Sequence, residues 1–509
     1  MVSNNMDNSM RMTGFASGMD VESMVNQLME AERQPLQKME QDQKWVELQR
    51  DAYREANTKL SELDGEISNM QQSSTYLSKS TESSNEEAIT ATAGQDSETG
   101  NYSIDVEQLA TAAIKAGDKG AFQNDNPDFD PLESLNEQGA DGGYVGEEIS
   151  LTYHNEEGAQ DVSFTLDEGD SLSDVFSKIS NQSDGNLRGM YDQNSDRVII
   201  ERTEEGSFNE NGDEIEFNSS FFDDVLNMNG VAEEGGNEAR FNYNGIEMTS
   251  QNNNYELNGV NFEFHAVTGG NPTNITVGND VDAAMEQITG FIDKYNETID
   301  YMNGKTSEEK NRDYPPLTER QTEEMSEREI ELWQEKSQSG LLRSDSTIEM
   351  GVSSMRSSWY ESVEGTGNED IKSVLDVGIT TSSNWRDNGK LEVDEAELRQ
   401  KLQEDPEAVM NLFHNSSEGE ERGITQRVED SLDSMMNQIT DRAGNEFQQP
   451  QQYTLGRELV DMAERMSNFE RRMQQTEQRY WDQFTRMEQA VQEMNSQSQQ
   501  MQQQLGGMM

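Results

Sequence analysis

The sequence predicts an α+β multidomain protein, in which a discontinuous helical stalk and a terminal coiled coil from both chain ends carry inserted β-rich head domains. Three observations predict this class. Apolar residues recur at helical spacing near both ends of the chain, alternating apolar and polar residues fill much of the middle, and 509 residues are too many for one ordinary core. We therefore expect several compact units.

The N-terminal region predicts two helical pieces. Asp20 is placed to cap a helix that carries Val25 and Leu28, and Pro35 is expected to end or restart that helix. The second piece needs a partner surface, for which the C-terminal heptads are one candidate. Its apolar face recurs at three- and four-residue intervals and comprises Trp45, Leu48, Ala52, Ala56, Leu60, Leu63, Ile67 and Met70.

The middle of the chain predicts strands with one short helix among them. Tyr102, Ile104 and Val106 show the alternation of a half-buried strand, and similar runs follow further along. Asn258-Gly259 between two such runs predicts a two-residue hairpin turn. Leu172 begins a short helical face, so this region is expected to fold as small β-rich and α+β units.

Helical spacing returns at Val281. The charged stretch of residues 303–335 is poor in apolar residues and predicts a partly helical surface insertion. Further on, Asp394 and Asp405 are placed to cap two helices, the second of which has Pro406 at its first position.

The C-terminal tract has the clearest period. A heptad a series runs through Leu459, Met466, Met473, Tyr480, Met487, Met494 and Met501. The companion d series weakens after Thr476, where Phe484 and Val491 lie one place later than the heptad requires, so the seam drifts. Methionine favours adaptable packing. The pattern predicts a coiled coil, with one face of an ordinary bundle helix as the alternative.

These patterns divide the chain into segments. They are an N-terminal coiled-coil or assembly segment (1–42), a helical leg (43–80 and 280–425), a first β-rich head domain (81–115 and 237–279), a second α+β head domain (116–236) and a C-terminal helix or coiled coil (426–509).

The charge of the chain excludes several classes of partner. The formal net charge is −63, which repels nucleic acid phosphates and argues against anionic membrane surfaces. No apolar run predicts stable membrane insertion, and the polar residues 1–12 do not form an ordinary cleaved signal peptide. The mean hydropathy of −0.95 indicates much solvated surface. Such acidity leads us to expect a halophilic or haloalkaliphilic source, where salt screens self-repulsion.

No residue pattern predicts catalysis, a cofactor or a metal site. The chain has no cysteine, and His154, His265 and His414 lack a second ligand at metal-binding spacing. Residues 126–137 resemble a calcium loop, but Pro131 stands where glycine normally permits the sharp turn, so a solvated loop is favoured. Phosphate-loop and nucleophile-elbow motifs are absent from the sequence. We expect a protein that is not an enzyme.

Two segments carry a resemblance to a known family. The first begins Gly14-Phe15-Ala16-Ser17-Gly18-Met19-Asp20 and continues to Leu36, and the second runs from Gly389 to Phe413. Both resemble signatures of bacterial flagellar filament cap proteins, also called the hook-associated protein 2 family. Residues 314–343 are similar to an insertion in cap proteins of Bacillus-like bacteria.

The resemblance implies a secreted, extracellular subunit at the distal tip of the flagellum. It implies export through the flagellar type III apparatus with an export chaperone, assembly as a homo-oligomer, commonly of five, and contact with flagellin and junction hook-associated proteins. Such a cap promotes flagellin polymerisation and filament elongation, prevents loss of unpolymerised flagellin and is required for motility.

The residues expected to serve assembly are Gly18, Asp20, Val25 and Leu28 near the N-terminus and the a series near the C-terminus, namely Leu459, Met466, Met473, Tyr480, Met487, Met494 and Met501.

Two alternative functions stay open. One is another axial flagellar protein, such as a junction or hook component. The other is a surface adhesin with a coiled-coil stalk and a glycan-binding head, an activity that can coexist with capping.

Overall fold

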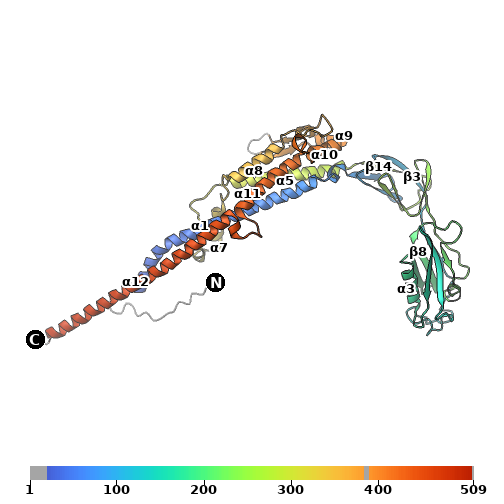
Figure 1. Cartoon of the computed structure of the whole chain (residues 1–509), viewed down its shortest axis with the longest axis horizontal. Helices are drawn as coiled ribbons and strands as arrows, with labels where there is room; N and C mark the ends of the chain where they lie inside the picture. The colour runs from blue at the N-terminus through green and yellow to red at the C-terminus, as the bar shows by residue number, and fades with distance from the viewer. Residues whose placement is uncertain (1–19, 383–388, 507–509) are drawn as a thin grey trace. The chain divides into compact units, whose positions relative to one another are not determined.

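The computed structural model describes residues 20–382 and 389–506 (Figure 1). The chain divides into two compact units, of which unit 1 comprises residues 1–76 and 282–509 and unit 2 comprises residues 77–281. Unit 1 is built mainly from long helices, whereas unit 2 is built mainly from antiparallel sheets. The α+β multidomain class predicted from the sequence is therefore confirmed.

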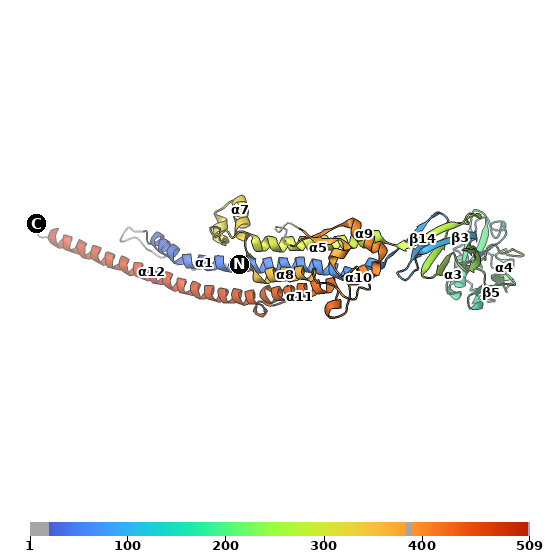
Figure 2. The same ribbon diagram turned by 90° about the horizontal axis from the view of Figure 1, so that it is seen from above.

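Five long helices dominate unit 1. They are α1 (Val21–Met70), α5 (Val281–Ser307), α8 (Ser346–Ser358), α11 (Ile424–Ala443) and α12 (Thr454–Gly506). The shorter α-helices and strands of the unit are α2 (Ser74–Leu77), α6 (Glu319–Glu323), α7 (Glu327–Gln338), α9 (Glu395–Glu404), α10 (Pro406–Phe413), and the hairpin of β15 (Ile379–Thr381) with β16 (Leu391–Val393). Figure 2 shows α1, α5, α8 and α11 running alongside one another.

The apolar face predicted along the second part of α1 is largely buried. Ala52, Ala56, Leu60, Leu63, Ile67 and Met70 are all in the core. Helix α1 packs against α11 as well as α12, and α11 packs in turn against α8. The C-terminal heptads are thus only one of the surfaces that cover α1.

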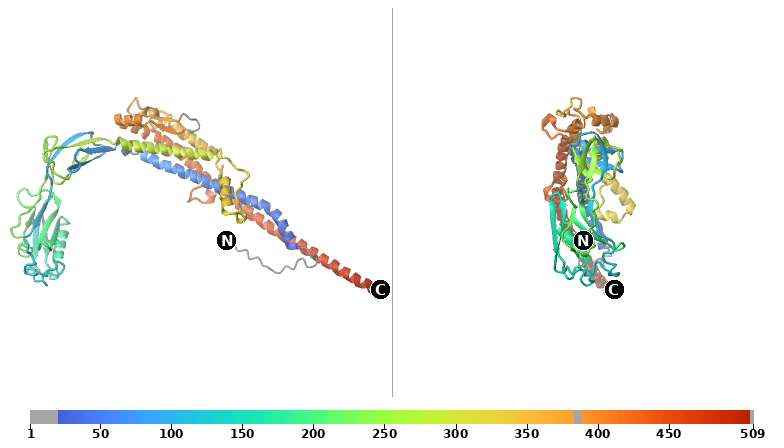
Figure 3. Two further views of the ribbon diagram at one scale, coloured as in Figure 1. Left: turned by 180° about the vertical axis from the view of Figure 1, so that it is seen from behind. Right: turned by 90° about the vertical axis from the view of Figure 1, so that its right-hand side faces the viewer.

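The prediction that Pro35 divides the N-terminal helix is wrong, because α1 is continuous from Val21 to Met70. Proline removes one amide donor and crowds the carbonyl four residues earlier, which costs about 3 kcal/mol in a helix interior. Here the helix is held by packing on both sides of Pro35, at Val25 and Met29 before it and at Val46 after it. The ribbon of α1 bends in its N-terminal part (Figure 3), as expected where a proline interrupts the hydrogen-bond ladder.

A buried polar cluster ties α1 to α8 and α11. The Tyr53 hydroxyl donates to the Asp345 carboxylate, and an Arg442 nitrogen lies 3.3 Å from the same carboxylate. Asp345 also caps α8, because its Oδ1 accepts from the amides of Thr347 at 3.1 Å and Ile348 at 3.2 Å. Burial, together with the Asp345 carboxylate, raises the pKa of Tyr53. The hydroxyl therefore stays protonated and serves as a donor.

Both predicted aspartate caps are confirmed. Asp394 accepts from the amides of Ala396 and Glu397 at the start of α9, and Asp405 accepts from the amide of Ala408 at the start of α10, where Pro406 is the first residue. The predicted surface insertion is partly helical, because it contains α6 and most of α7. It begins slightly later than predicted, since α5 extends to Ser307.

Unit 2 contains four antiparallel sheets. The strands are β1 (Lys79–Ser83), β2 (Ile89–Ala93), β3 (Gly100–Gln108), β4 (Ala112–Ala116), β5 (Glu148–Asn155), β6 (Gly158–Thr165), β7 (Leu187–Asp192), β8 (Arg197–Glu205), β9 (Ile215–Phe217), β10 (Ala239–Tyr243), β11 (Ile246–Ser250), β12 (Asn254–Leu257), β13 (Val260–Phe264) and β14 (Thr273–Asn279). Their orders are β1-β14-β3-β10-β11, β12-β13-β2, β4-β8-β7 and β6-β5-β9. The helices are α3 (Leu172–Gln182) and α4 (Phe221–Asp224).

The sheets of unit 2 enclose two apolar cores. One core draws on β2, β3, β10, β13 and β14, and the other is built from residues 113–228, including Leu172, Val175 and Ile179 of α3. The predicted hairpin turn is confirmed, because Leu257 pairs with Val260 and the two residues between them, Asn258 and Gly259, have φ of 54° and 75°. Positive φ at both turn positions is the geometry that suits Asn-Gly.

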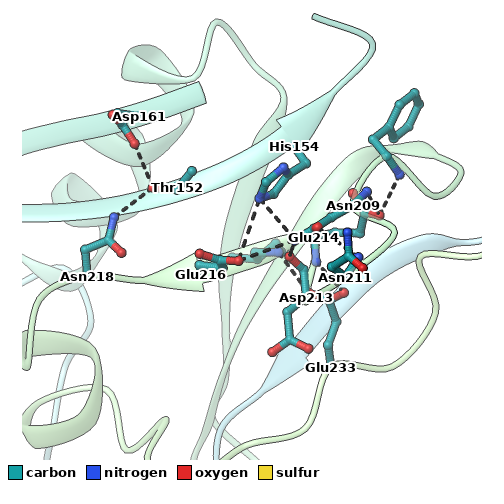
Figure 4. A network of polar contacts seen from close by, with 12 residues as sticks. Thr152, His154, Asp161, Asn209, Asn211, Asp213, Glu214, Glu216, Asn218 and Glu233 are labelled. Atoms are coloured by element: carbon teal, nitrogen blue, oxygen red, sulfur yellow. Dashed lines mark hydrogen bonds and ion pairs between the residues drawn. The ribbon is translucent and has the colours of Figure 1, made fainter. Parts of the chain in front are cut away.

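Polar contacts anchor β9 and the loop before it (Figure 4). The Glu233 carboxylate accepts from the amides of Glu214 at 2.8 Å and Ile215 at 2.9 Å. His154 Nε2 lies 3.2 Å from the Asn209 amide nitrogen and 3.8 Å from Glu216 Oε1. His154 is therefore part of the polar network around β9 and the loop before it.

No cluster of three or more His, Asp or Glu side chains that could hold a metal ion occurs within residues 20–382 and 389–506. Among the helices of those same residues, none combines the length and apolarity needed to cross a membrane.

Candidate assembly site on the terminal helices

The start of α1 packs against the middle of α12. Val21, Val25 and Met29 are spaced four residues apart on one face of α1, and each is only 1% exposed. The half-buried residues around them are Met24, Met473, Tyr480, Trp481 and Phe484. Segments from opposite ends of the sequence thus form one apolar cluster, which we call the terminal cluster.

Hydrogen bonds and an ion pair border the terminal cluster. The Tyr480 hydroxyl donates to Glu32 Oε1 at 3.1 Å, and this bond raises the pKa of Tyr480. Arg320 from the helical insertion lies 3.2 Å from the Glu30 carboxylate, although both side chains are well exposed. An exposed pair of this kind contributes at most about 1 kcal/mol.

The insertion also contacts α1 beyond the terminal cluster. The Gln41 amide donates to Gln321 Oε1 at 3.3 Å, and the Lys310 ammonium lies 3.8 Å from the centre of the Trp45 ring. The start of α1 therefore has two neighbours, α12 and the insertion.

The predicted N-terminal site residues have different environments. Asp20 caps α1, because its carboxylate accepts from the Ser23 amide at 3.0 Å. Val25 is in the terminal cluster. Leu28 is 41% exposed and does not join it. Gly18 lies outside the described residues.

The predicted a series of α12 is covered over part of its length. Met473 and Tyr480 belong to the terminal cluster, and Leu459, Met466 and Met487 are half-buried. Met494 and Met501 are each 63% exposed. The structure therefore brings Val25 together with the middle of the series and leaves its C-terminal end uncovered.

The predicted drift of the seam is confirmed. After Tyr480 the half-buried apolar positions are Trp481, Phe484, Met487 and Val491, whereas Gln483 and Ala490 are exposed. The step from Tyr480 to Phe484 replaces a three-residue interval with a four-residue one, which is a stutter in the heptad. From Phe484 onward, Met487, Met494 and Met501 occupy the d position of the heptad instead of the a position.

A like-charge contact lies on the same pair of helices. Half-buried Glu40 on α1 lies close enough to Glu470 on α12 and to Glu319 at the start of α6 for their charges to act on it. Burial, followed by repulsion from Glu470 and from Glu319, raises the pKa of Glu40. A carboxyl whose pKa is raised by folding destabilises the folded state when it is ionised, so this contact weakens unit 1 at neutral pH and low salt.

Replacing Glu40 with Gln is expected to stabilise unit 1 at pH 7 by up to about 0.5 kcal/mol after solvent screening. The gain should shrink in molar NaCl, and it should disappear as the pH falls below the ordinary Glu value of 4.5, where the wild-type carboxyl is protonated. Thermal unfolding followed by circular dichroism measures both effects. Glu47→Gln is the control, since Glu47 pairs with Lys44 at 3.0 Å and its loss should not stabilise.

Sequence reasoning did not place Trp481 or the Glu40–Glu470 contact in this site. Tyr480, Trp481 and Phe484 span a wider sector of the helix surface than the two seam positions of a heptad occupy. This apolar sector could have indicated that a wider face of α12 is covered. No pattern in the sequence indicated that Glu40 and Glu470 would interact, because they are far apart in the chain and acidic residues are abundant throughout it.

Long helices from both chain ends pack together in unit 1, and the β-rich unit 2 is inserted between them in the sequence, which is the architecture of a structural protein. Two models of one protein family match the chain and identify it more specifically. The family model described as "Flagellar hook-associated protein 2 C-terminus" matches residues 236–496, and the corresponding N-terminal model matches residues 17–113. The chain therefore belongs to the flagellar hook-associated protein 2 family, a family of structural cap proteins of the bacterial flagellum.

Individual relatives agree with this assignment. The chain is 38% identical over 528 residues to flagellar hook-associated protein 2 of Halalkalibacterium halodurans, covering 96% of this chain and 98% of the relative. It is 25% identical over 609 residues to the protein of the same name from Thermotoga maritima, covering 95% and 94%. The crystal structure of the Escherichia coli flagellar cap protein FliD, domains D1-D2-D3, is similar in fold, with a TM-score of 0.55, 17% identity and coverage of 77% of this chain and 96% of that one.

Proposed function

We propose that this chain is a subunit of an oligomeric cap at the distal end of the flagellar filament. In this role it promotes the polymerisation of flagellin, prevents the loss of unpolymerised flagellin and is required for motility. The subunit acts outside the cell, and its partners are other copies of itself, in a ring for which five is the expected number, together with flagellin and the junction hook-associated proteins. Export uses the flagellar type III apparatus and an export chaperone.

The observation that carries this proposal is similarity over nearly the whole chain, at 38% identity, to a flagellar hook-associated protein 2. The second family signature supports it. Its strand β16 is held to α5 by Asn296, whose Oδ1 accepts from the Leu391 amide at 2.8 Å and whose Nδ2 donates to the Leu391 carbonyl at 2.9 Å. The signature thus belongs to the body of unit 1 rather than to a surface loop.

Deletion of the gene in the source bacterium tests the proposal. We expect short or absent filaments, flagellin monomers in the medium and loss of swimming, all restored by the wild-type gene. A junction protein would give a similar deletion phenotype, so the tagged chain must also be located. Immunogold label at filament tips supports a cap, whereas label at the junction of hook and filament, or normal filaments in the deletion strain, would refute it.

Adhesion by the β-rich unit and a halophilic source both stay predictions. Binding of the purified chain to glycan arrays tests the first, with unit 2 as competitor. Titration of NaCl against the circular dichroism signal tests the second, since the carboxylate repulsion at Glu40 should make stability rise with salt.

A further inference from the structure

Helix α12 continues well beyond its contact with α1 (Figure 2). The terminal cluster reaches Phe484 on α12 and Val21 at the start of α1. Met494 and Met501 lie further along α12 and are each 63% exposed. Large apolar side chains on a helix that extends from a folded unit need a covering surface.

The exposed methionines continue the covered seam in phase. After the stutter, intervals of three and four residues connect Phe484, Met487, Val491, Met494, Ser498, Met501 and Leu505. The first three of these residues are half-buried, so the same stripe of α12 passes from a covered part to an uncovered part. Alternating three- and four-residue spacing is the pattern of a coiled-coil seam.

The uncovered part is also unusual in charge. The chain carries 101 acidic residues and a formal net charge of −63, yet no charged side chain occurs from Met494 to the last residue, Met509. Identical copies of so acidic a chain repel one another over most of their surfaces. A segment with only methionine, leucine, glutamine and other uncharged residues can approach its own copy without that repulsion.

We propose that residues 487–502 of α12 associate in parallel with the same segment of neighbouring copies. The proposal rests on the proposed function, in which copies form a ring. Subunits related by a cyclic axis all point in the same direction, so identical segments meet in register and Met494 meets Met494. Helix α12 then has two roles, because its middle binds the α1 of its own chain and its end binds another copy.

The chemistry of the segment makes this contact adaptable and weak for a single pair. Methionine side chains repack readily, and a seam of few heptads is marginal when isolated. The contact is effective where the ring already holds the helices close together, because linked sites bind at high effective concentration. Since residues 494–502 of this segment carry no charged side chain, salt should not weaken the contact between them.

The absence of cysteine from the chain gives a direct test. Met494→Cys and Met501→Cys are separate variants, each with a single thiol on the seam. Ser496→Cys places a single thiol on the opposite face of the helix, within the same turn as Met494. A disulfide requires the two Cβ atoms to lie about 4 Å apart, so we expect roughly tenfold more disulfide-linked dimer at the two seam positions than at position 496. The full-length chain is oxidised at high concentration in high salt and analysed on non-reducing gels.

Charge substitution gives a second measurement. Met494→Glu/Met501→Glu puts two carboxylates on the seam, whereas Gln492→Glu/Gln499→Glu adds the same charge at the same spacing on an exposed face. All four positions are exposed, so both variants should fold. Sedimentation velocity should show an apparent dissociation constant at least about tenfold higher for the seam variant only.

The outcomes separate this inference from the proposed function. Equal cross-linking at positions 494 and 496, or no dimer at any position, would overturn it. So would a monomer in which the thiol at position 494 is shielded only while residues 1–19 are present, since the chain would then cover its own seam. If Met494→Cys and Met501→Cys give no cross-linked copies yet restore filaments to the deletion strain, the inference fails and the cap function stands. Normal filaments in the deletion strain would refute the cap function itself.

Discussion

A Val25→Asp chain should lose the pairing of α1 with α12 and fail to support filament growth. Val25 is 1% exposed in the terminal cluster, where Met473, Tyr480 and Trp481 surround it with apolar surface. Placing an unpaired carboxylate there costs about 3–5 kcal/mol if the contact is kept. The start of α1 can avoid this cost by detaching, because the later part of the helix is held separately by α11.

Hydrogen exchange measures this detachment. Amides of residues 21–32 should exchange much faster in Val25→Asp, whereas amides of residues 52–67 should keep their protection. In the deletion strain the variant should give short filaments and flagellin in the medium. Leu28→Asp is the matched control, because Leu28 is three residues away, apolar in the sequence and 41% exposed.

The control variant should exchange, fold and complement like the wild type. If Leu28→Asp were as damaging as Val25→Asp, the exposed face of α1 would be an essential contact with another molecule. If Val25→Asp kept normal protection at residues 21–32, the terminal cluster would not hold α1 in solution.

The two ends of the chain show how far the sequence could go. On α12 the long heptad series was enough to identify the seam and its drift at Phe484, since the period is repeated many times. On α1, Val21, Val25, Leu28 and Met29 are all apolar within two turns, so the buried face could not be chosen without knowing its partner. That is why Leu28 was grouped with Val25.

Pro35 and Glu40 show what local reasoning cannot supply. The local preference of Pro35 predicted a helix break, but packing before and after it outweighs a cost of about 3 kcal/mol. The repulsion at Glu40 arises from Glu470 and Glu319, which are brought to it only by the fold. The division of the chain into five segments stays a prediction. Helix α1 crosses the expected boundary at residue 42 without interruption.

Replacing Asp345 with Ala should destabilise unit 1 by about 3 kcal/mol, of which about 1 kcal/mol is the lost cap of α8 and about 2 kcal/mol is the unpaired Tyr53 hydroxyl. The cost is large because one buried carboxylate serves Tyr53, Arg442 and the start of α8 at once. Arg442 is partly exposed and can be solvated, so it adds little. Guanidinium unfolding followed by the helical circular dichroism signal reports on unit 1.

Asp394→Ala separates the cap from the cluster. Asp394 caps α9 through two amides as Asp345 caps α8, but it is exposed and holds no tyrosine, so its loss should cost only about 1 kcal/mol. Tyr53→Phe in the Asp345→Ala background completes the argument, because it removes the hydroxyl that the first change left without a partner. The double variant should be at least as stable as Asp345→Ala alone. If instead the two losses simply added, the Tyr53 hydroxyl would have another acceptor, and the Asp345 effect would be one of capping and charge alone.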